Sequence, residues 1–393
     1  MSVSRQEAAT RTVTPAQVRR FRFRRHQLDR APGTASGPTD CAVLDVGVQD
    51  TGPDGAAWAL VVRGVALTSL AAASDDLALA WTLRGAPHAY RRADLAAVAV
   101  ATAPFSEADA AKRVFDASKP LAEAGVDVLD ALRVVAGHER ELARRPVAKG
   151  DVSGALTSLL APEYLRACRP CDATHVYEQP FRLAALQAGL ELEPGTSPPV
   201  LHRAKGLRPN RFSTLGGEAE ARFDVVRGTL RFWGPATVKE VTTFLDAAHA
   251  DVRAHWPDDV VEVEVEGVPD RRHLLADDLP ALDDAGARTR ATDVAVRLLG
   301  PYDPFVQGRD RNVLVDDAER RTALWPVLGR PGAVVADGTV IGEWRPTTRG
   351  RSFTVRLTPW EQLTEVRRRQ VEAEAERLAA FKGLDLAAVH VEP

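Results

Sequence analysis

The sequence contains no long hydrophobic run and few cysteines. No apolar stretch approaches the ~18 residues that a helix needs to cross a bilayer, and the opening MSVSRQEAATRTVTPAQ lacks the apolar centre of a secretory signal peptide. Cys41, Cys168 and Cys171 are an odd number of thiols in a chain of 393 residues, which argues against a disulfide framework. We therefore expect a cytoplasmic protein of a reducing compartment that does not span a membrane.

Several familiar catalytic and metal-binding motifs are also missing. The sequence has no Gly-rich phosphate loop, no serine nucleophile elbow and no His-x-x-x-His pair. Cys168, Cys171 and His175 have the spacing of half a zinc site, but a structural zinc ion takes four ligands and no nearby cysteine or second histidine completes the set. We expect the two thiols to stay reduced and to pack between helices, and we predict neither a metal nor an organic cofactor.

Net charge is small, because 51 lysines and arginines are balanced by 54 aspartates and glutamates, giving −3. Binding to an acidic polymer must then come from local basic groups. Most of them are arginines, whose guanidinium can hold a phosphate through two hydrogen bonds. The alternative is that these runs are solvated faces whose stems cover apolar surface. The three groups are Arg19, Arg20, Arg22, Arg24 and Arg25; Arg203, Lys205, Arg208 and Arg211; and Arg345, Arg349 and Arg351.

Length and composition predict a globular protein of two to four compact units, with 45% hydrophobic and 27% charged residues. The order of helix and strand signals predicts an α+β fold, in which tandem winged helix-turn-helix domains precede a C-terminal β-domain with a terminal helix. The expected organisation is a flexible tail (1–13), a first winged-helix unit (14–149), a second (150–215), a third (216–292) and the C-terminal β-domain with its closing helix (293–393).

Local signals define the first unit. The segment TPAQVRRFRFRRHQL predicts a helix with Thr14 as N-cap and Pro15 at its first position, and the apolar CAVLDVGV predicts a strand. Gly52 and Pro53 are expected to begin the next helix. The segments AWTLRG and HAYRR are expected to pair as a wing hairpin around Gly85.

The later units follow similar logic. Residues 150–215 read as helix, short strand and helix. In the third unit, three helical segments (219–233, 236–248 and 249–256) precede the strictly alternating strand VVEVEVEG, which returns through RRHLLA. In the C-terminal domain, Asp337-Gly338 predicts a hairpin, RSFTVRLTPW predicts a strand and the helix that follows ends near residue 381.

Three consecutive polar residues, Gln49, Asp50 and Thr51, interrupt the apolar pattern in VGVQDTGPDG. One interpretation is ordinary turn chemistry before a helix that starts at Gly52 and Pro53. On an extended backbone the side chains of Gln49 and Thr51 would point to one side and that of Asp50 to the other. The choice between turn chemistry and an active site stays open from these residues alone.

The motifs VGVQDTGPDGAAWALVVRG, AWTLRGAPH, LRFWGPATVKEVTTFL, RLLGPYDPFVQGRDR and GTVIGEW, in this order, resemble the AlkZ/YcaQ-like family of bacterial winged-helix DNA glycosylases. The resemblance extends over about residues 14–380. It implies tandem winged helices and a C-terminal β-domain that form a concave basic surface for duplex DNA. It also implies excision of alkylated bases and unhooking of crosslinks through a Gln-x-Gln or Gln-x-Asp motif.

Gln49 matches the first glutamine of that motif, whereas Thr51 falls where the second Gln or Asp belongs. Cleaving an N-glycosidic bond develops an oxocarbenium-like sugar and needs an oriented or deprotonated water, and a threonine hydroxyl is no base near neutral pH. Three alternatives therefore remain. Asp50 replaces the missing carboxylate, or Gln49 and Thr51 only orient water on a cationic leaving base, or catalysis is lost.

The resemblance thus predicts a monomeric, monofunctional DNA glycosylase that excises alkylated or crosslinked purines from duplex DNA near the nucleoid. Gln49, Asp50 and Thr51 are the expected catalytic residues, with His88 and Arg84 in support, and the three basic groups are expected to contact phosphates. The rival functions are a non-catalytic winged-helix DNA-binding protein, serving as a regulator or damage sensor, and a platform for a protein partner.

Overall fold

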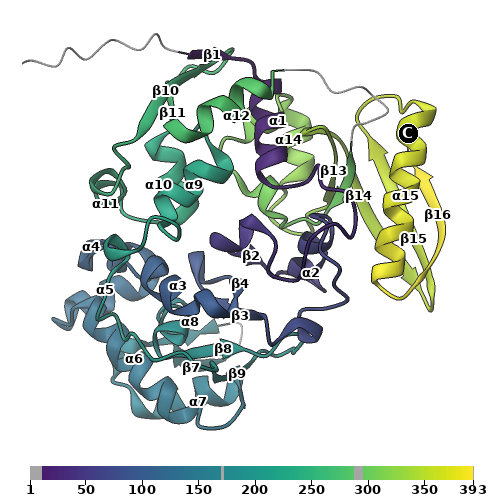
Figure 1. The fold of residues 1–393 in the computed structure, drawn as a ribbon. Coiled ribbons are helices and arrows are strands. Elements are labelled where there is room, and N and C mark those ends of the chain that lie inside the picture. Colours follow the sequence, from purple (N-terminus) through teal and green to yellow (C-terminus); the bar gives the residue numbers. More distant parts are fainter. Residues whose placement is uncertain (1–10, 170–171, 287–294, 393) are drawn as a thin grey trace, which may run out of the picture.

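The computed structural model describes residues 11–169, 172–286 and 295–392. Helices and strands are mixed along the chain, which confirms the α+β class (Figure 1). Residues from about 30 to 215 form the lower part in the view of Figure 1, α9 to α12 lie above them, and the C-terminal sheet lies to one side. None of the helices in the described ranges combines the length and apolarity that crossing a membrane requires.

The largest sheet has six strands in the order β2-β4-β3-β8-β9-β5. The predicted hairpin is confirmed, because β3 and β4 pair antiparallel with Trp81 opposite Pro87. Strands β5 and β9 come from either side of residue 149 and also pair, so the predicted division between the first and second units cuts through one sheet. The strands are β2 (Val48–Gln49), β3 (Leu77–Trp81), β4 (Pro87–Arg91), β5 (Val147–Ala148), β8 (Leu190–Leu192) and β9 (Val200–Arg203).

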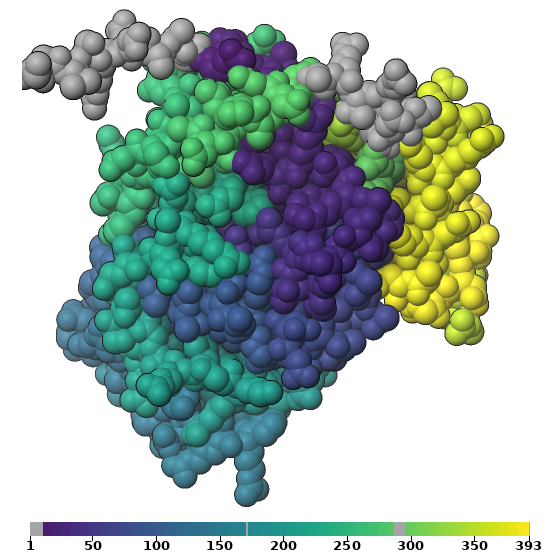
Figure 2. Space-filling model, viewed as in Figure 1, coloured from purple at the N-terminus to yellow at the C-terminus, as the bar shows by residue number. Residues whose placement is uncertain are grey.

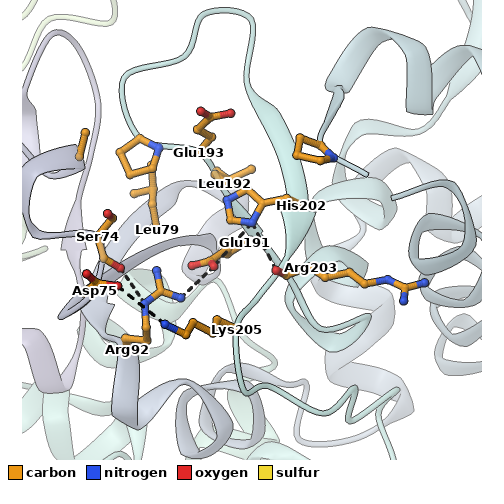
Figure 3. Close-up of a pocket in the computed structure, with 13 residues that line it drawn as sticks. Ser74, Asp75, Leu79, Arg92, Glu191, Leu192, Glu193, His202, Arg203 and Lys205 are labelled. Carbon is orange, nitrogen blue, oxygen red and sulfur yellow. Dashed lines mark hydrogen bonds and ion pairs between the residues drawn. The ribbon is translucent and has the colours of Figure 1, made fainter. Parts of the chain in front are cut away.

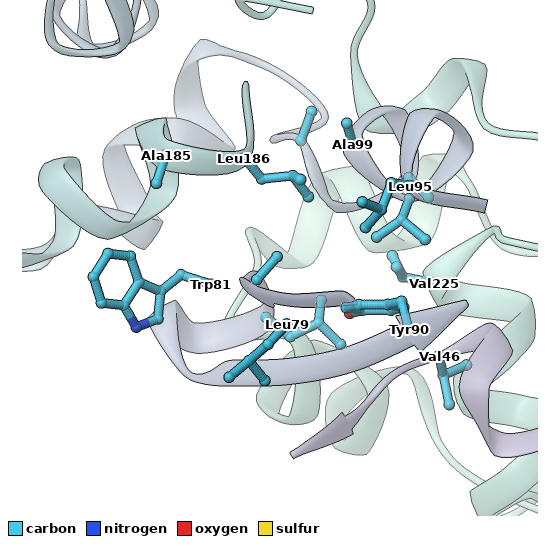
Figure 4. Close-up of a cluster of buried hydrophobic side chains, with 14 of the residues drawn as sticks. Val46, Leu79, Trp81, Tyr90, Leu95, Ala99, Ala185, Leu186 and Val225 are labelled. Atoms are coloured by element: carbon cyan, nitrogen blue, oxygen red, sulfur yellow. The ribbon is translucent and has the colours of Figure 1, made fainter. Parts of the chain in front are cut away.

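Helices cover this sheet and build the main core. Figure 4 shows Leu95 and Ala99 of α3, with Leu186 of α8, above the strands that carry Leu79 and Tyr90. The first helix predicted within residues 150–215 is α7, and a small hairpin of β6 and β7 follows it where one short strand was expected. The elements are α3 (Leu95–Thr102), α4 (Glu107–Arg113), α5 (Ser118–Glu123), α6 (Val128–Leu142), α7 (Lys149–Leu159), β6 (Leu165–Cys168), β7 (Ala173–Val176) and α8 (Glu178–Gln187).

Three helices and an antiparallel hairpin follow, as predicted for the third unit. The elements are α9 (Val225–Trp233), α10 (Val238–Leu245), α11 (His249–Ala254), β10 (Val260–Val265) and β11 (Arg272–Leu275). Helix α10 starts two residues later than the predicted segment (236–248), because Thr237 and Glu240 form a capping box at its N-terminus. Buried side chains of this segment belong to the same core as the six-stranded sheet.

The N-terminal segment is attached differently from the prediction. Residues Arg11–Val13, expected in the flexible tail, form strand β1, which pairs parallel with β10. Helix α1 (Pro15–Arg25) has the predicted Thr14 cap, but it packs against α9, α12 (Leu279–Asp284), α13 (Arg311–Leu314) and β14. Its buried face carries Phe21, which packs with strand β10. Figure 2 shows this segment in purple at the surface, between the green and yellow parts of the chain.

The C-terminal sheet has the order β12-β13-β14-β15-β16 and its own core. The hairpin at Asp337-Gly338 and the closing helix are confirmed, whereas the final strand, parallel to its neighbour, was not predicted. Trp58 from α2 (Gly55–Val61) enters this core and donates a hydrogen bond to the carbonyl oxygen of Leu298 at 2.7 Å. The elements are β12 (Val296–Leu299), α14 (Ala318–Leu324), β13 (Gly332–Ala336), β14 (Thr339–Arg349), β15 (Ser352–Pro359), α15 (Glu365–Phe381) and β16 (Asp385–Val391).

Candidate active site

The segment VGVQDTGPDG connects β2 to α2, but not as the Gly-Pro signal suggested. The chain turns at Gly52, where φ is +80°, and α2 begins at Gly55 rather than at Pro53. The carboxylate of Asp50 accepts a hydrogen bond from the backbone N–H of Ala56 at 2.9 Å. A side chain five residues before the helix therefore satisfies one of its first N–H groups, which no local start signal reveals.

The side chains of Gln49 and Thr51 point together, as the alternation of an extended strand predicted. Gln49 Nε2 donates a hydrogen bond to Thr51 Oγ1 at 2.8 Å, and Gln49 Oε1 accepts one from Arg84 Nη2 at 3.3 Å. Because a guanidinium can only donate, the amide oxygen must be the atom that faces Arg84. One lone pair on this oxygen and the proton of the Thr51 hydroxyl remain for another group.

Arg84 is fixed in place by contacts with α10. It lies in a 3₁₀-turn (Leu83–Gly85) with φ of +59°, a conformation uncommon for residues other than glycine. Its Nη1 donates to the carbonyl oxygen of Phe244 at 2.8 Å, and its guanidinium lies 4.8 Å from the centre of that ring. Burial, and then the positive charge of Arg309, lower the pKa of Arg84 to about 10, so the group stays charged at neutral pH.

His88 lies directly opposite Gln49 in the β2–β4 pair, within the predicted hairpin. Its Nδ1 lies 2.9 Å from the carbonyl oxygen of Ala86, which only accepts, so Nδ1 carries a proton. Burial, followed by the charge of Arg84, lowers the pKa of His88 to about 3. The ring is therefore neutral near pH 7 and cannot protonate a leaving group.

A cavity of about 760 Å³ opens beside Asp50 and Thr51. Its wall includes Trp81, Arg182 and the loop after β8, and its volume is in the range of small-molecule sites. Burial raises the pKa of Asp50 above its usual range, the N–H of Ala56 opposes this shift, and Asp54 reinforces it. The carboxylate thus borders the cavity while one of its oxygens caps α2.

The first predicted basic group does not form a free surface. Arg22 is 3% exposed, forms an ion pair with Asp310 at 2.6 Å and also donates to the carbonyl oxygen of Gly234, so it does not lie on a free surface. The other four arginines also contact their own chain. Arg19 donates to Val313, Arg20 to Ala285, Arg24 to Asp284, and Arg25 pairs with Asp278. Their main visible role is to attach α1.

The second group, Arg203, Lys205, Arg208 and Arg211, is exposed but distant from Gln49. Strand β9 is four steps from β2 in the sheet, a separation of ~19 Å at the usual strand spacing. In the third group, Arg345 Nη1 donates to the carbonyl oxygen of Gly329 at 2.8 Å, while Arg349 and Arg351 lie at the far end of the β14–β15 hairpin, where Arg351 pairs with Asp385. DNA binding by these residues remains a prediction.

A different arginine cluster lies next to the site and was missed in the sequence. Like charge from Arg330 lowers the pKa of Arg309, and both of these lower the pKa of Arg311, after burial as the largest cause. Arg309 in turn lowers the pKa of Arg84. These four residues, Arg84, Arg309, Arg311 and Arg330, are called the arginine cluster below. Among the described residues, no carboxylate forms an ion pair with any of them. In the sequence, only Arg309 and Arg311 lie close together, in the segment GRDRN. Arg84 and Arg330 come from two other segments, so the cluster could not be seen as one basic run.

A second cavity, of about 550 Å³, lies near β8 and β9. None of the predicted catalytic or supporting residues lines it. Figure 3 shows Arg92 directed toward Glu191 and Lys205 directed toward Asp75. These basic side chains of the second cavity are therefore paired with carboxylates. Of the three residues with the spacing of half a zinc site, Cys171 lies outside the described residues. Within the described ranges, no three His, Cys, Asp or Glu side chains are grouped so as to hold a metal ion.

Comparisons with known proteins address the fold and the family of this chain. The fold is similar to the solved structure of the Streptomyces sahachiroi DNA glycosylase AlkZ, with a TM-score of 0.70, 19% identity and coverage of 97% of this chain and 100% of that chain. At this identity the likeness shows the fold alone. Comparison with curated proteins gives no match. The family described as DNA glycosylase AlkZ-like matches residues 43–381, and because this match extends over most of the sequence, the chain belongs to that family.

Proposed function

We propose that this protein hydrolyses the N-glycosidic bond of alkylated or crosslinked purines in duplex DNA. The observation that carries the proposal is the hydrogen-bonded set Thr51–Gln49–Arg84, formed at the position where the resemblance places the glycosylase motif. Family membership supports the reaction class.

In this mechanism, Gln49 and Thr51 orient the attacking water. Arg84 occupies one lone pair of the Gln49 amide oxygen, and the other accepts a hydrogen bond from water. An alkylated purine already carries a positive charge, so it departs without a protein acid. The C1′–N bond breaks with its electrons going to the base, the oxocarbenium forms a bond to the water oxygen, and the excess proton passes to solvent. Neutral His88 is not required as an acid.

Asp50 has a positioning role in this proposal. One carboxylate oxygen holds the start of α2 through Ala56, and Asp50 takes no part in the hydrogen bond between Gln49 and Thr51. The adjacent cavity of about 760 Å³ has enough room for a released purine. We also interpret α9 to α11 with the β10–β11 hairpin as a winged helix that helps to hold duplex DNA, in a monomeric protein that acts near the nucleoid.

The test is release of a base from duplex DNA containing N7-methylguanine, followed as abasic product. The wild-type protein is expected to release the base, and Gln49→Ala to lose this activity while still binding the duplex. Gln17→Ala is a control at a glutamine that donates to Leu282 on a different part of the fold. Absence of abasic product from the wild type, with N7-methylguanine and crosslinked duplex alike, contradicts the proposal.

Thr51 itself supports the second candidate, a DNA-binding protein without catalysis that serves as a regulator or damage sensor. A hydroxyl occupies the place of the family's amide or carboxylate, and it cannot deprotonate water near neutral pH. Such a protein binds duplex equally well before and after Gln49→Ala and releases no base. Selection from random duplexes then distinguishes a regulator, which enriches one sequence, from a damage sensor, which does not.

A further inference from the structure

Two exposed apolar side chains form the tip of the loop between α14 and β13. Val327 is 93% exposed and Leu328 is 85% exposed, more than any other large hydrophobic residue in the described part of the chain. The loop turns at Gly329, where φ is +65°, and Arg345 Nη1 donates to the carbonyl oxygen of that glycine. Its shape is thus supported from the neighbouring sheet although its tip contacts solvent.

Two guanidinium groups lie at the base of this loop. Arg330 directly follows the turn, donates from Nε to the carbonyl oxygen of Pro326 at 3.3 Å, and lies 5.2 Å from the centre of the Tyr302 ring. Arg311 lies 4.9 Å from the centre of the Trp325 ring, just before the loop. Aromatic faces keep these cations in place without neutralising them.

The cluster extends from this tip to the candidate active site. Arg309 follows Gly308, which lies against the Trp233 ring, and Trp233 lies 4.4 Å from the Phe244 ring that supports Arg84. The Nε of Arg309 is buried and has no hydrogen-bond partner. Asp246 partly offsets the positive charge of Arg84 and Arg309 without forming an ion pair with either. The repulsion that remains within the cluster is relieved by an anion with regularly spaced charges, such as a nucleic acid backbone.

From this juxtaposition we propose that the arginine cluster grips backbone phosphates of duplex DNA while Val327 and Leu328 insert between neighbouring bases as an apolar wedge. Apolar side chains flanked by basic residues unstack and kink a duplex in this way, because the phosphate contacts offset the loss of stacking. A step opened beside Gln49 exposes the glycosidic bond to the attacking water. This inference rests on the proposed function for its setting and concerns DNA binding, not the bond-breaking step.

Insertion by Val327 and Leu328 and phosphate binding by the arginine cluster can be measured separately in one experiment, on a short undamaged duplex that contains 2-aminopurine. Unstacking raises 2-aminopurine fluorescence, and the salt dependence of affinity counts the phosphates that are contacted. The wild-type protein is expected to raise the fluorescence. The double variant Val327→Ser/Leu328→Ser should lose most of this rise with an unchanged salt slope, because neither residue carries charge. Arg330→Ala should lower the slope of log affinity against log salt by about 0.9 for each lost phosphate contact.

Matched controls exist on the opposite part of the fold. Leu159→Ser changes a leucine that is 54% exposed at the end of α7, and Arg145→Ala changes an exposed arginine after α6; both should bind and unstack the duplex like the wild type. Wild-type fluorescence with the double serine variant, or an unchanged salt slope for Arg330→Ala, overturns the inference. If the loop tip instead binds a protein partner, neither variant should change the fluorescence or the salt slope, and this result also overturns the inference. Base release is not measured, so failure of the glycosylase proposal is a separate result.

Discussion

Restoring a carboxylate at position 51 is the most direct test of the chemistry proposed for this site. Thr51→Asp places an acceptor where Gln49 Nε2 already donates, at 2.8 Å in the native chain. Arg84 bonds the other end of the same amide, and its positive charge favours the ionised form of a nearby carboxylate. We therefore expect the new aspartate to be ionised at neutral pH and to act on the water that Gln49 holds.

The magnitude follows from what each group can contribute. A positioned base typically contributes 10²–10⁴-fold, so the single-turnover rate of base release by Thr51→Asp should rise by at least about 100-fold, equivalent to ~3 kcal/mol of the activation barrier. Thr51→Ala removes one neutral hydrogen bond, of about 1 kcal/mol, and should slow release by about fivefold. Thr51→Ser keeps the hydroxyl and should remain close to the wild-type rate.

The assay uses protein in excess over a labelled duplex with one N7-methylguanine, with the abasic product cleaved by alkali and counted at each time. Affinity for the intact duplex is measured in parallel, so that a change in binding is not taken for a change in chemistry. If Thr51→Asp binds like the wild type but releases base no faster, then the water is not activated at position 51 and the assignment of Gln49 and Thr51 is refuted.

Three further predictions concern stability. The pKa of His88 falls from 6.5 when unfolded to about 3 when folded, so its contribution is complete above pH 6.5 and is lost as the pH falls toward 3. At pH 5 this loss is about 2 kcal/mol, and His88→Gln should show a shallower fall of unfolding free energy with acid in denaturant titrations. Arg22→Ala leaves Asp310 buried without that partner and should cost about 3–5 kcal/mol by the same method, against little change for exposed Arg145→Ala. Asp50→Ala should cost about 1 kcal/mol through the lost cap of Ala56, while Asp50→Asn, which keeps an acceptor oxygen, should unfold near the wild-type midpoint.

The elements that depend on neighbouring residues, such as alternating strands and tight turns, were predicted correctly from the sequence. Strand β10 followed from strict alternation, and the β13–β14 hairpin followed from Asp337-Gly338. Helix α1 was also predicted, but its place was not. Its arginines bond to residues more than 200 positions away, such as Arg22 to Asp310, so a run that appeared to be a basic surface instead joins distant segments.

The same distinction applies to the candidate site. The common direction of Gln49 and Thr51 follows from the two-residue period of a strand and was predictable. The start of α2 was not, because its cap is the side chain of Asp50 and not a residue at the helix boundary. Arg309 and Arg330 approach Arg84 only after three segments have folded together, so counting neighbouring arginines could not reveal the cluster.

Because Arg84 lies beside Gln49, its positive charge affects both DNA binding and the proposed reaction. A guanidinium beside Gln49 opposes the positive charge that an oxocarbenium-like sugar develops, and Arg309 adds to this repulsion. In the proposed complex, backbone phosphates beside the reacting nucleotide would offset this positive charge when they occupy the arginine cluster. Without such an anion, the arrangement that orients Gln49 would raise the barrier. On the proposed function, we therefore expect the guanidiniums of the arginine cluster to matter more for the reaction than the arginines elsewhere in the chain.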